Sequence, residues 1–340
     1  MVASGDHGGI DRRTLLRGAL ASGVALGAAG VGLRLRRGAS LWNERVFSPP
    51  GEARVAVLGA SSYTPDLSRL LQDGLSAIGV DVRGASVLLK PNLVEYDPGT
   101  SINTDPRIVA AAVLAFRRLG AVAVTVGEGP GHRRDTMYVV ERSGLADALR
   151  GVDAPFVDLN VDAVDAVPLS SSYTTLRELW LPRSVTRADI VVSMPKMKTH
   201  HWAGVTLSLK NCFGCVPSRI YGWPKNVLHY AGIDGSILDV AAAVRPDLAI
   251  VDGIVAMEGN GPISGTPVSL GAIVVADDPV AADVVSAGIM GMDPERIAYL
   301  AEAGRFLGQS DRDRITMRGE DPSGLTMRLA PAPGFDGLPD

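Results

Sequence analysis

The amino-acid sequence predicts an α/β protein with a largely parallel sheet and helices on both faces, a three-layer sandwich. Short apolar runs alternate with helix-length segments along most of the chain, as in parallel strands joined by crossover helices. Aromatic residues make up only 5% of the chain, while alanine, valine and glycine are abundant, which favours close-packed layers. At 340 residues, the chain is long enough to bury a large core.

The expected elements follow from hydrophobic periodicity and from helix-capping signals. Asp105 and Asp278 each precede a proline, an arrangement that caps a helix, and Asp234 is expected to cap another. The strands are expected at residues 54–59, 86–94, 121–126, 155–159, 164–169, 188–192, 247–257 and 270–276, with a strand-turn meander near 176–181. The helices are expected at residues 66–78, 106–119, 136–149, 233–244, 279–289 and 294–303.

Residues 1–37 have the pattern of an export leader. Arg12 and Arg13 precede an apolar run of 16 residues, 18–33, and three further arginines follow it. Paired arginines before an apolar run mark the twin-arginine route, by which bacteria export folded proteins. The run is shorter than a membrane span, although an uncleaved leader would serve as an anchor. We therefore expect a periplasmic or extracytoplasmic protein that uses the twin-arginine export machinery.

Behind the leader we expect a linker at residues 38–52, an α/β domain at 53–310 and a tail at 311–340. The leader contains six arginines and two aspartates, so 27 basic and 35 acidic side chains remain, a net charge of −8. Such a domain lacks the positive field on which general nucleic-acid binding depends. We expect no nucleic-acid partner, and a membrane contact only through the leader.

Lysine is rare in this chain, and its placement is the main functional signal. Of the 33 basic residues only five are lysines, and Lys196, Lys198 and Lys210 lie within fifteen residues of one another. An ammonium group is compact and its pKa moves readily on burial, whereas a guanidinium is a wide planar fork. The cluster therefore predicts a site that binds an anion or uses an amine. The alternative is a solvated basic turn.

Polar residues also follow three of the expected strands. The carboxyl ends of strands in an open α/β sheet meet at one edge, where ligands bind. We therefore expect these groups to converge in one cleft and to perturb each other's pKa values. The residues expected to bind substrate are Lys90, Asn92, His200, Asn211 and Asn260, and those expected to act in catalysis are Lys196, Lys198, Lys210, Asp252 and Glu258.

Cys212 and Cys215 form a C-x-x-C motif and are the only cysteines in the sequence. In an exported protein, such a pair can be a disulfide, a dithiol redox centre or two metal ligands. In the last case, His200, His201 or His229 would complete a tetrahedral set. The alternative is that Cys215 is buried as a small apolar residue and that Cys212 is incidental. Two cysteines cannot by themselves ligate a four-cysteine iron–sulfur cluster.

Other positions in the sequence carry weaker functional signals. The loop GEGPGH, residues 127–132, joins a strand to a helix, but its glycine spacing matches neither a dinucleotide-binding loop nor a P-loop. Asp283 lies one turn into the helix that follows Asp278 and can reach the same cleft. The sequence contains no Gly-x-Ser-x-Gly elbow, Walker motif or His-Glu-x-x-His motif, which disfavours the corresponding hydrolases and nucleotidases.

Five stretches together resemble the DUF362 family of bacterial and archaeal proteins. They are LKPNLV (89–94), ADIVVSMPKMKTH (188–200), VTLSLKNCFGCVP (205–217), DGIVAMEGNGP (252–262) and DDPVAADVVSAGIMGMDPERI (277–297). The resemblance implies an α/β domain without an established reaction. Many members also carry a ferredoxin-like module, whose cysteine quartet is absent from this sequence. The family's shared residues correspond to Lys90, Asn92, Lys196, Lys198, His200, Lys210, Asn211, Asp252, Glu258 and Asn260.

The sequence leaves two principal functions open. The first is an exported enzyme, or enzyme-like domain, that binds a small anionic substrate through the lysines, with carboxylates as acid–base groups or ligands of a divalent cation. The second is a redox or metal-handling accessory protein that uses the C-x-x-C pair. A non-catalytic binding protein would share the lysine cluster but would show no turnover.

Overall fold

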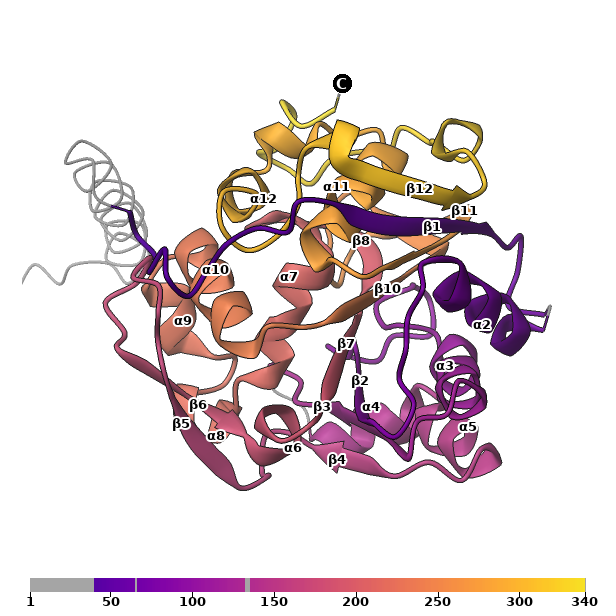
Figure 1. Cartoon of the computed structure of the whole chain (residues 1–340), viewed down its shortest axis with the longest axis horizontal. Helices are drawn as coiled ribbons and strands as arrows, with labels where there is room; N and C mark the ends of the chain where they lie inside the picture. Colours follow the sequence, from indigo (N-terminus) through magenta and orange to yellow (C-terminus); the bar gives the residue numbers. More distant parts are fainter. Residues whose placement is uncertain (1–39, 65, 132–134, 340) are drawn as a thin grey trace, which may run out of the picture.

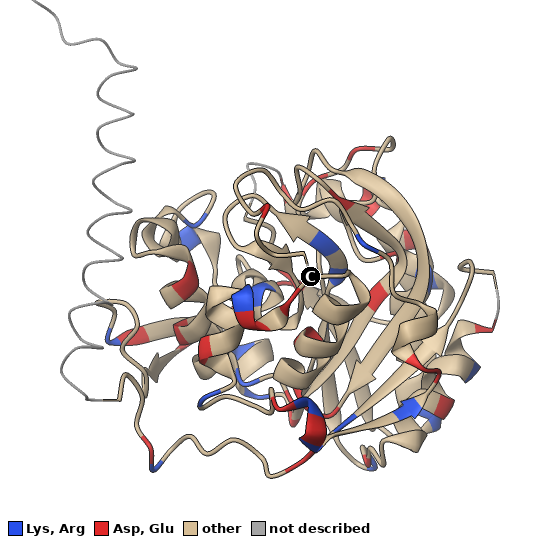
Figure 2. Cartoon of the chain, turned by 90° about the horizontal axis from the view of Figure 1, so that it is seen from above, with Lys and Arg blue, Asp and Glu red and all other residues tan. Residues whose placement is uncertain are grey.

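The computed structural model describes residues 40–64, 66–131 and 135–339 (Figure 1). The expected leader, residues 1–37, lies outside this part of the chain. Among the described residues, no helix is both long and apolar enough to cross a membrane. Acidic and basic residues are interspersed over the described chain rather than gathered on a face of one sign (Figure 2).

A ten-stranded mixed sheet forms the centre of the described chain. Its order is β12-β1-β11-β10-β7-β2-β3-β4, and β8 and β9 join it through β10. Most of its strand pairs are parallel, which confirms the predicted α/β class. A separate hairpin pairs β5 with β6. The strands are β1 (Ala53–Gly59), β2 (Ser86–Pro91), β3 (Ala123–Glu128), β4 (Phe156–Asp158), β5 (Val164–Pro168), β6 (Glu178–Pro182), β7 (Ile190–Met194), β8 (Lys196–His200), β9 (Gly204–Thr206), β10 (Leu248–Glu258), β11 (Thr266–Ala276) and β12 (Ile315–Gly319).

Helices cover both faces of the sheet (Figure 1). Successive residues of a strand point to opposite faces, so Val55 and Val57 belong to one apolar core and Ala56 and Leu58 to the other. The second core is covered by α2 (Leu67–Ala77), α3 (Pro106–Arg118), α4 (Thr136–Arg142) and α5 (Leu145–Gly151). The first is covered by α7 (Ser208–Asn211), α10 (Ile233–Val244), α11 (Pro279–Ile289) and α12 (Ala298–Ala303), with the short α6 (Arg183–Thr186), α8 (Ser218–Tyr221) and α9 (Asn226–Tyr230) beside them.

Two of the three predicted helix caps are confirmed. The carboxylates of Asp105 and Asp278 accept hydrogen bonds from the first turns of α3 and α11. The prediction for Asp234 is wrong, because Gly232, with φ 99°, occupies the cap of α10 and Asp234 lies in the first turn. Its negative charge there still complements the helix dipole.

Two segments predicted as single helices are interrupted, and the expected tail contributes a strand. Residues 136–149 divide into α4 and α5 because Gly144 adopts a left-handed conformation, with φ 81°. Residues 294–303 divide into a short 3-10 turn (Pro294–Arg296) and α12. Strand β12, from the residues expected as tail, pairs with β1 in parallel.

Strands β7 and β8 follow one another along the same neighbour, β10. The first residues of β10 pair with β7, whereas Asp252 and Met257 pair with Lys196 and Lys198 of β8. Strand β8 therefore continues past the carboxyl end of β7 and carries its lysines beyond that edge of the sheet. This path follows from the chain's passing directly from β7 to β8 through Pro195.

Replacing Asp278 with alanine is expected to lower the free energy of unfolding by about 1–2 kcal/mol. Its carboxylate accepts hydrogen bonds from the backbone N–H groups of Val280 and Ala281 and, at 2.8 Å, of Gln309. Urea unfolding should show a lower midpoint with an unchanged m-value. Asp66→Ala, which removes the exposed cap of α2, is the matched control. Equal losses in the two variants would contradict a special role for the buried cap.

Candidate functional site

The lysines of the chain are almost all buried. Four of the five have at most 2% of their surface exposed, and the fifth, Lys210, is half-buried. Lysine is rarely buried to this degree unless it is paired. The interactions of these ammonium groups therefore define the candidate site. The four buried residues are Lys90, Lys196, Lys198 and Lys225.

Lys90 and Glu128 form an ion pair where β2 and β3 end. The distance from Lys90 Nζ to Glu128 Oε1 is 2.6 Å, and both side chains are buried. Lys90 Nζ also donates to Asn211 Oδ1 at 3.1 Å, and Asn92 Nδ2 donates to the same oxygen at 3.2 Å. The structure thus brings together Lys90, Asn92 and Asn211, three of the residues that the sequence assigns to substrate binding.

Helix α7 is held against this pair by Asp283 of α11. The carboxylate of Asp283 accepts hydrogen bonds from the backbone N–H groups of Ser208 at 2.6 Å and Leu209 at 3.0 Å. Burial raises the pKa of Asp283 to about 7. Asp283 therefore orients the helix that carries Lys210 and Asn211 rather than reaching the cleft itself.

Lys225 enters the site from the N-cap of α9. Its backbone adopts a left-handed conformation, with φ 65°, which is uncommon for a residue other than glycine and recurs at functional sites. Lys225 Nζ donates to the backbone carbonyls of Gly129 at 2.8 Å and Phe213 at 2.5 Å. Burial lowers the pKa of Lys225 to about 8.

The glycine-rich loop after β3 permits this close packing. A Cβ atom on Gly131 would meet the side chain of Lys225 at 3.2 Å, and one on Gly129 would meet the carbonyl oxygen of Gly214 at 2.9 Å. The glycines of this loop therefore face neighbouring protein atoms, which accounts for their presence without a phosphate ligand. His132, at the end of the loop, lies outside the described residues.

Lys210 differs from the other lysines because it has no acceptor. Within the described chain its ammonium group forms no hydrogen bond and no ion pair; it lies 4.0 Å from the centroid of the Phe213 ring. Burial, Lys225 and Lys90 together lower the pKa of Lys210 to about 7. A substantial fraction of this amine is therefore neutral near pH 7.

A row of rings runs outward from Lys210. Phe213 contacts His229 at a centroid distance of 5.9 Å, and His229 contacts Trp202 at 4.9 Å. Trp202 contacts His201 at 4.8 Å, which stacks on His200 at 5.1 Å. Trp202 is 50% exposed, so this row reaches from the buried lysines to the surface.

The histidines nearest the lysines are neutral at pH 7. Burial and Lys210 lower the pKa of His229 to about 4, and the same two causes lower the pKa of His200. The backbone N–H of Trp202 donates to His200 Nδ1 at 3.0 Å, so neutral His200 carries its proton on Nε2. His229 Nδ1 lies 3.0 Å from a backbone carbonyl, so its Nε2 is an acceptor. The pair supplies one donor and one acceptor.

Lys196 and Asp252 form a second ion pair, in which every donor of the ammonium group has a protein acceptor. Lys196 Nζ lies 2.6 Å from Asp252 Oδ2 and also donates to Tyr63 Oη at 2.9 Å and to the carbonyl of Val255 at 3.1 Å. The carboxylate of Asp252 also accepts from Tyr63 Oη at 2.8 Å and from the backbone N–H of Asp105 at 2.9 Å. All three donors of the ammonium group are engaged, so this pair ties β8, β10 and the start of α3 together.

Lys198 is fully buried but has no carboxylate partner in the described chain. Its ammonium group donates to the backbone carbonyls of Ile102 at 2.7 Å and Pro262 at 3.3 Å. Burial, then Lys210 and Lys196, lower its pKa well below that of a free lysine. We refer to Lys90, Lys198, Lys210 and Lys225, with Glu128, His200 and His229, as the lysine site.

Glu258 and Asn260 lie at the far end of β10, and among the described residues no hydrogen bond or ion pair joins them to the lysine site. Glu258 Oε2 accepts a hydrogen bond from the backbone N–H of Ala330 at 2.8 Å, and Asn260 is exposed. In the described chain, no group of three or more His, Cys, Asp or Glu side chains is placed to hold a metal ion.

The two cysteines are buried free thiols. Burial raises the pKa of both, for Cys215 to about 11. The reactive form of cysteine is the thiolate, which such surroundings disfavour. Cys212 and Cys215 belong to the apolar core, and this environment supports packing rather than redox chemistry or metal binding.

Three members of the lysine site were not singled out from the sequence as substrate-binding or catalytic residues. Glu128 is the last residue of strand β3. The rule that ligands bind where the strands end, which selected Lys90, therefore also applies to Glu128. Lys225 is one of only five lysines, and this scarcity is a signal that could have identified it. The sequence suggests His229 only as a metal ligand. No local pattern places it beside Lys210, because its position depends on the packing of α9 against the turn that contains Phe213.

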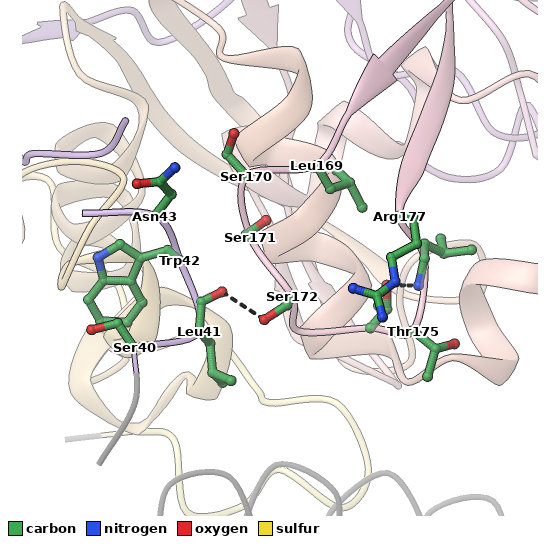
Figure 3. A pocket seen from close by; sticks show the side chains of 12 residues that line it. Ser40, Leu41, Trp42, Asn43, Leu169, Ser170, Ser171, Ser172, Thr175 and Arg177 are labelled. Carbon is green, nitrogen blue, oxygen red and sulfur yellow. Dashed lines mark hydrogen bonds between the residues drawn. The ribbon is translucent and has the colours of Figure 1, made fainter. Parts of the chain in front are cut away.

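A cavity of about 440 Å³ lies elsewhere in the molecule (Figure 3). It is bounded by residues 40–43 on one side and by residues 169–172 and 174–177 on the other. The hydroxyl of Ser172 donates a hydrogen bond to the carbonyl of Leu41 at 3.3 Å, which joins the two segments (Figure 3). No residue of the lysine site lines this cavity.

The fold and the site define an α/β protein with buried lysines at the carboxyl edge of a mixed sheet. The model of the DUF362 family, a domain of unknown function, matches residues 87–288. That match covers more than half of the chain and includes all five lysines. The chain therefore belongs to the DUF362 family.

Individual relatives are similar over most of the chain. The thylakoid-associated protein sll1697 of Synechocystis sp. is 35% identical over 248 residues, which cover 70% of this chain and 73% of the relative. Lactate racemase apoprotein from Thermoanaerobacterium thermosaccharolyticum aligns with a TM-score of 0.48 and 14% identity, over 72% of this chain and 57% of its own. A protein from Thermotoga maritima aligns with a TM-score of 0.36 and 12% identity, over 59% and 53%. The chain spans little more than half the length of these two structures, and at these scores neither supports a statement about function.

Lys196→Met and Lys210→Met are expected to change stability in opposite directions. Lys196→Met leaves Asp252 buried without its cation and should lower the free energy of unfolding by about 3 kcal/mol or more. Lys210→Met removes a cation that has no anionic partner, so it should raise the free energy of unfolding. The pKa of Lys210 is about 7 in the folded chain and 10.5 for a free lysine. The gain is therefore full below pH 7 and fades as the pH rises toward 10.5.

Urea unfolding of both variants and the parent protein at pH 6 and pH 10 measures these effects. Lys210→Arg is the matched control, because it keeps the positive charge and should not be stabilised at either pH. A loss of stability in Lys210→Met at pH 6 would show that Lys210 has a stabilising partner, contrary to the geometry.

The thiols are expected to react with a disulfide reagent such as dithionitrobenzoate only when the chain unfolds. Both are buried and protonated at pH 8, and the thiolate is the attacking species. The reaction rate should therefore be negligible in the native protein and rapid in urea. Cys212→Ser and Cys215→Ser assign the two thiols. A fast native reaction of either thiol would favour the redox hypothesis instead.

Proposed function

We propose that this protein binds a small anionic molecule at the lysine site and acts on it as an enzyme. The observation that carries the proposal is the ammonium group of Lys210, which is half-buried, lies among other cations and forms no ion pair in the described chain. A cation in this position destabilises the fold unless an anion accompanies it. A bound anion would supply the missing partner.

The charges of the site support this proposal. Glu128 acts on Lys198, Lys210 and Lys225 but is already paired with Lys90, and Asp158 also acts on Lys225. The second ion pair, between Lys196 and Asp252, is neutral as a unit and adds no net charge. A small dianion would therefore meet an excess of positive charge in surroundings of low dielectric, where each contact is strong.

The outer part of the site is where a ligand would enter. Lys210 and His229 are half-buried and Trp202 is half exposed, whereas Lys90 and Glu128 behind them are closed off from solvent. The ligand would thus contact Lys210 first. Entry from this side agrees with the observation that the amine of Lys210 has no protein acceptor among the described residues.

Groups for proton transfer surround the same position. Glu128 Oε2 and Asn92 Oδ1 are buried and have no hydrogen-bond partner in the described chain, so a hydroxyl or amino group of a bound molecule would satisfy them. His229 adds a neutral imidazole. General acid–base catalysis uses groups of these kinds. Glu128 keeps one carboxylate oxygen without a hydrogen bond, whereas both oxygens of Asp252 are engaged, so Glu128 and His229 fit this role better than Asp252.

We also propose that the protein is exported in its folded state by the twin-arginine route. The support is the sequence alone: paired arginines precede the apolar run in residues 11–33. The body that would be exported is acidic and places its lysines in the interior, so its surface is compatible with a small anionic ligand rather than with nucleic acid.

Oxalate and inorganic phosphate are suitable probes of the proposed site, because both are small anions. Isothermal titration calorimetry should show binding to the parent protein and a loss of affinity of about tenfold or more in Lys210→Met, since a charge-assisted hydrogen bond is removed. Arg219→Met, which removes an exposed cation of α8, is the control and should bind normally. Equal losses in both variants would point to general electrostatic attraction and would contradict a specific site.

The affinity for oxalate should fall as the pH rises from 6 to 9. The pKa of Lys210 is about 7 and that of Lys225 about 8, and the anion binds the protonated amines. If one proton is taken up on binding, Kd rises about tenfold for each pH unit above the pKa of that amine. Oxalate itself stays doubly charged over this range, so an unchanged Kd would exclude these amines from the binding.

A further inference from the structure

Lys210 is the only lysine of the described chain that is partly exposed and whose amine has no hydrogen bond or ion pair. Lys90 and Lys196 are in ion pairs, and Lys198 and Lys225 donate to backbone carbonyls. All four are closed off from solvent. The Nζ atom of Lys210 instead lies over the face of Phe213 in a half-buried position. A bound molecule could therefore form a covalent bond with Lys210 without disturbing an existing hydrogen bond.

The surroundings of Lys210 favour the neutral amine, which is the nucleophilic form. The charged groups that act on it are Lys225 at the start of α9, Lys90 of β2 and Glu128 of β3, and it acts in turn on Lys198 of β8. The two imidazoles, His200 and His229, are neutral. Burial and two cations, Lys225 and Lys90, set against one paired carboxylate, disfavour the ammonium form. A lysine next to other cations is a known form of activated nucleophile.

We propose that Lys210 is a nucleophile that condenses with the carbonyl group of a small oxo acid to form an imine. This inference rests on the proposed anion site, which would hold the carboxylate of the oxo acid. Lys198 and Lys225 are buried and already donate to backbone carbonyls, so they would attract that carboxylate through their charge, without direct contact. A carbonyl carbon next to it would then lie within reach of Lys210 Nζ.

The step balances without a further reactant. The lone pair of the neutral amine forms the C–N bond, and the π electrons of the carbonyl move to its oxygen, which takes up a proton. That proton comes from the nitrogen. The carbinolamine then loses its hydroxyl group together with the one remaining N–H proton as water, which leaves the C=N bond. His229, a neutral imidazole that packs on the same Phe213 ring, is placed to move the proton from nitrogen to oxygen.

The choice of lysine in this position agrees with imine chemistry. The chain uses arginine for 28 of its 33 basic residues, and an arginine would bind an anion at least as well as a lysine does. Arginine does not lose its proton in proteins, whereas a buried lysine does. An amine that must become neutral therefore explains a lysine at position 210 better than anion binding alone.

Borohydride trapping tests the proposal with the purified full-length chain. The protein is incubated with pyruvate or glyoxylate and reduced with sodium cyanoborohydride, and the modified residue is located by peptide mass mapping. The expected result is a stable secondary amine on Lys210, on the order of tenfold more abundant than on any other lysine. With acetaldehyde, which has the carbonyl but no charge, the yield on Lys210 should fall to the level of the other lysines.

Lys210→Arg separates the two proposals. It keeps the positive charge and should still bind oxalate, but it cannot form the imine and should give no adduct at this position. The initial trapping rate at saturating pyruvate should rise from pH 6 to pH 8 as the amine loses its proton, opposite to the affinity for oxalate. If oxalate binds and Lys210 stays unmodified, or if acetaldehyde modifies it equally well, the imine proposal is overturned and the anion site stands. If oxalate does not bind, the anion site is overturned.

Discussion

The ion pair between Lys90 and Glu128 is the contact on which the site is built. It joins the ends of β2 and β3 at 2.6 Å in the interior of the protein, and Asn211 attaches α7 to it. The turn that follows α7 packs so closely on the pair that a Cβ atom on Gly214 would collide with both partners. Glu128 also acts on Lys198, Lys210 and Lys225, but it is already paired with Lys90, so it compensates the charge of these amines only in part. The electrostatic character of the site is therefore a consequence of this one contact.

Two lysine environments lie close together and differ in chemistry. Lys196 is surrounded by Asp252, Tyr63 and a carbonyl, so its charge is neutralised and all its donors are engaged. Such a pair is costly to break, and it connects two strands, β8 and β10, whose pairing is interrupted by a register shift. Lys210 has a ring face and cationic neighbours instead. An unpaired cation in such surroundings lowers stability. The fold thus separates a lysine that holds strands together from one whose amine has no hydrogen-bonding partner in the described chain.

Much of the fold could be predicted because its signals are local. Alternating apolar runs identified the strands of the sheet, and an aspartate before a proline identified the starts of α3 and α11. The errors also have local causes that the side-chain pattern does not reveal. Gly232 replaces Asp234 as the cap of α10, and Gly144 interrupts a continuous helical pattern, because each glycine adopts a positive φ. Whether a glycine takes that conformation depends on the packing around it.

The sequence by itself determined the class of the fold, the family and the segment that carries the site, because periodicity and the scarcity of lysine are properties of the chain alone. The convergence of Lys90, Asn92 and Asn211 also followed from the rule that parallel strands end at one edge. Only the tertiary structure decided which lysines are engaged and which is free. Whether a buried ammonium is neutralised depends on carboxylates and carbonyls that lie within about 3 Å, and residues such as Glu128 and Lys225 reach that distance from distant parts of the chain.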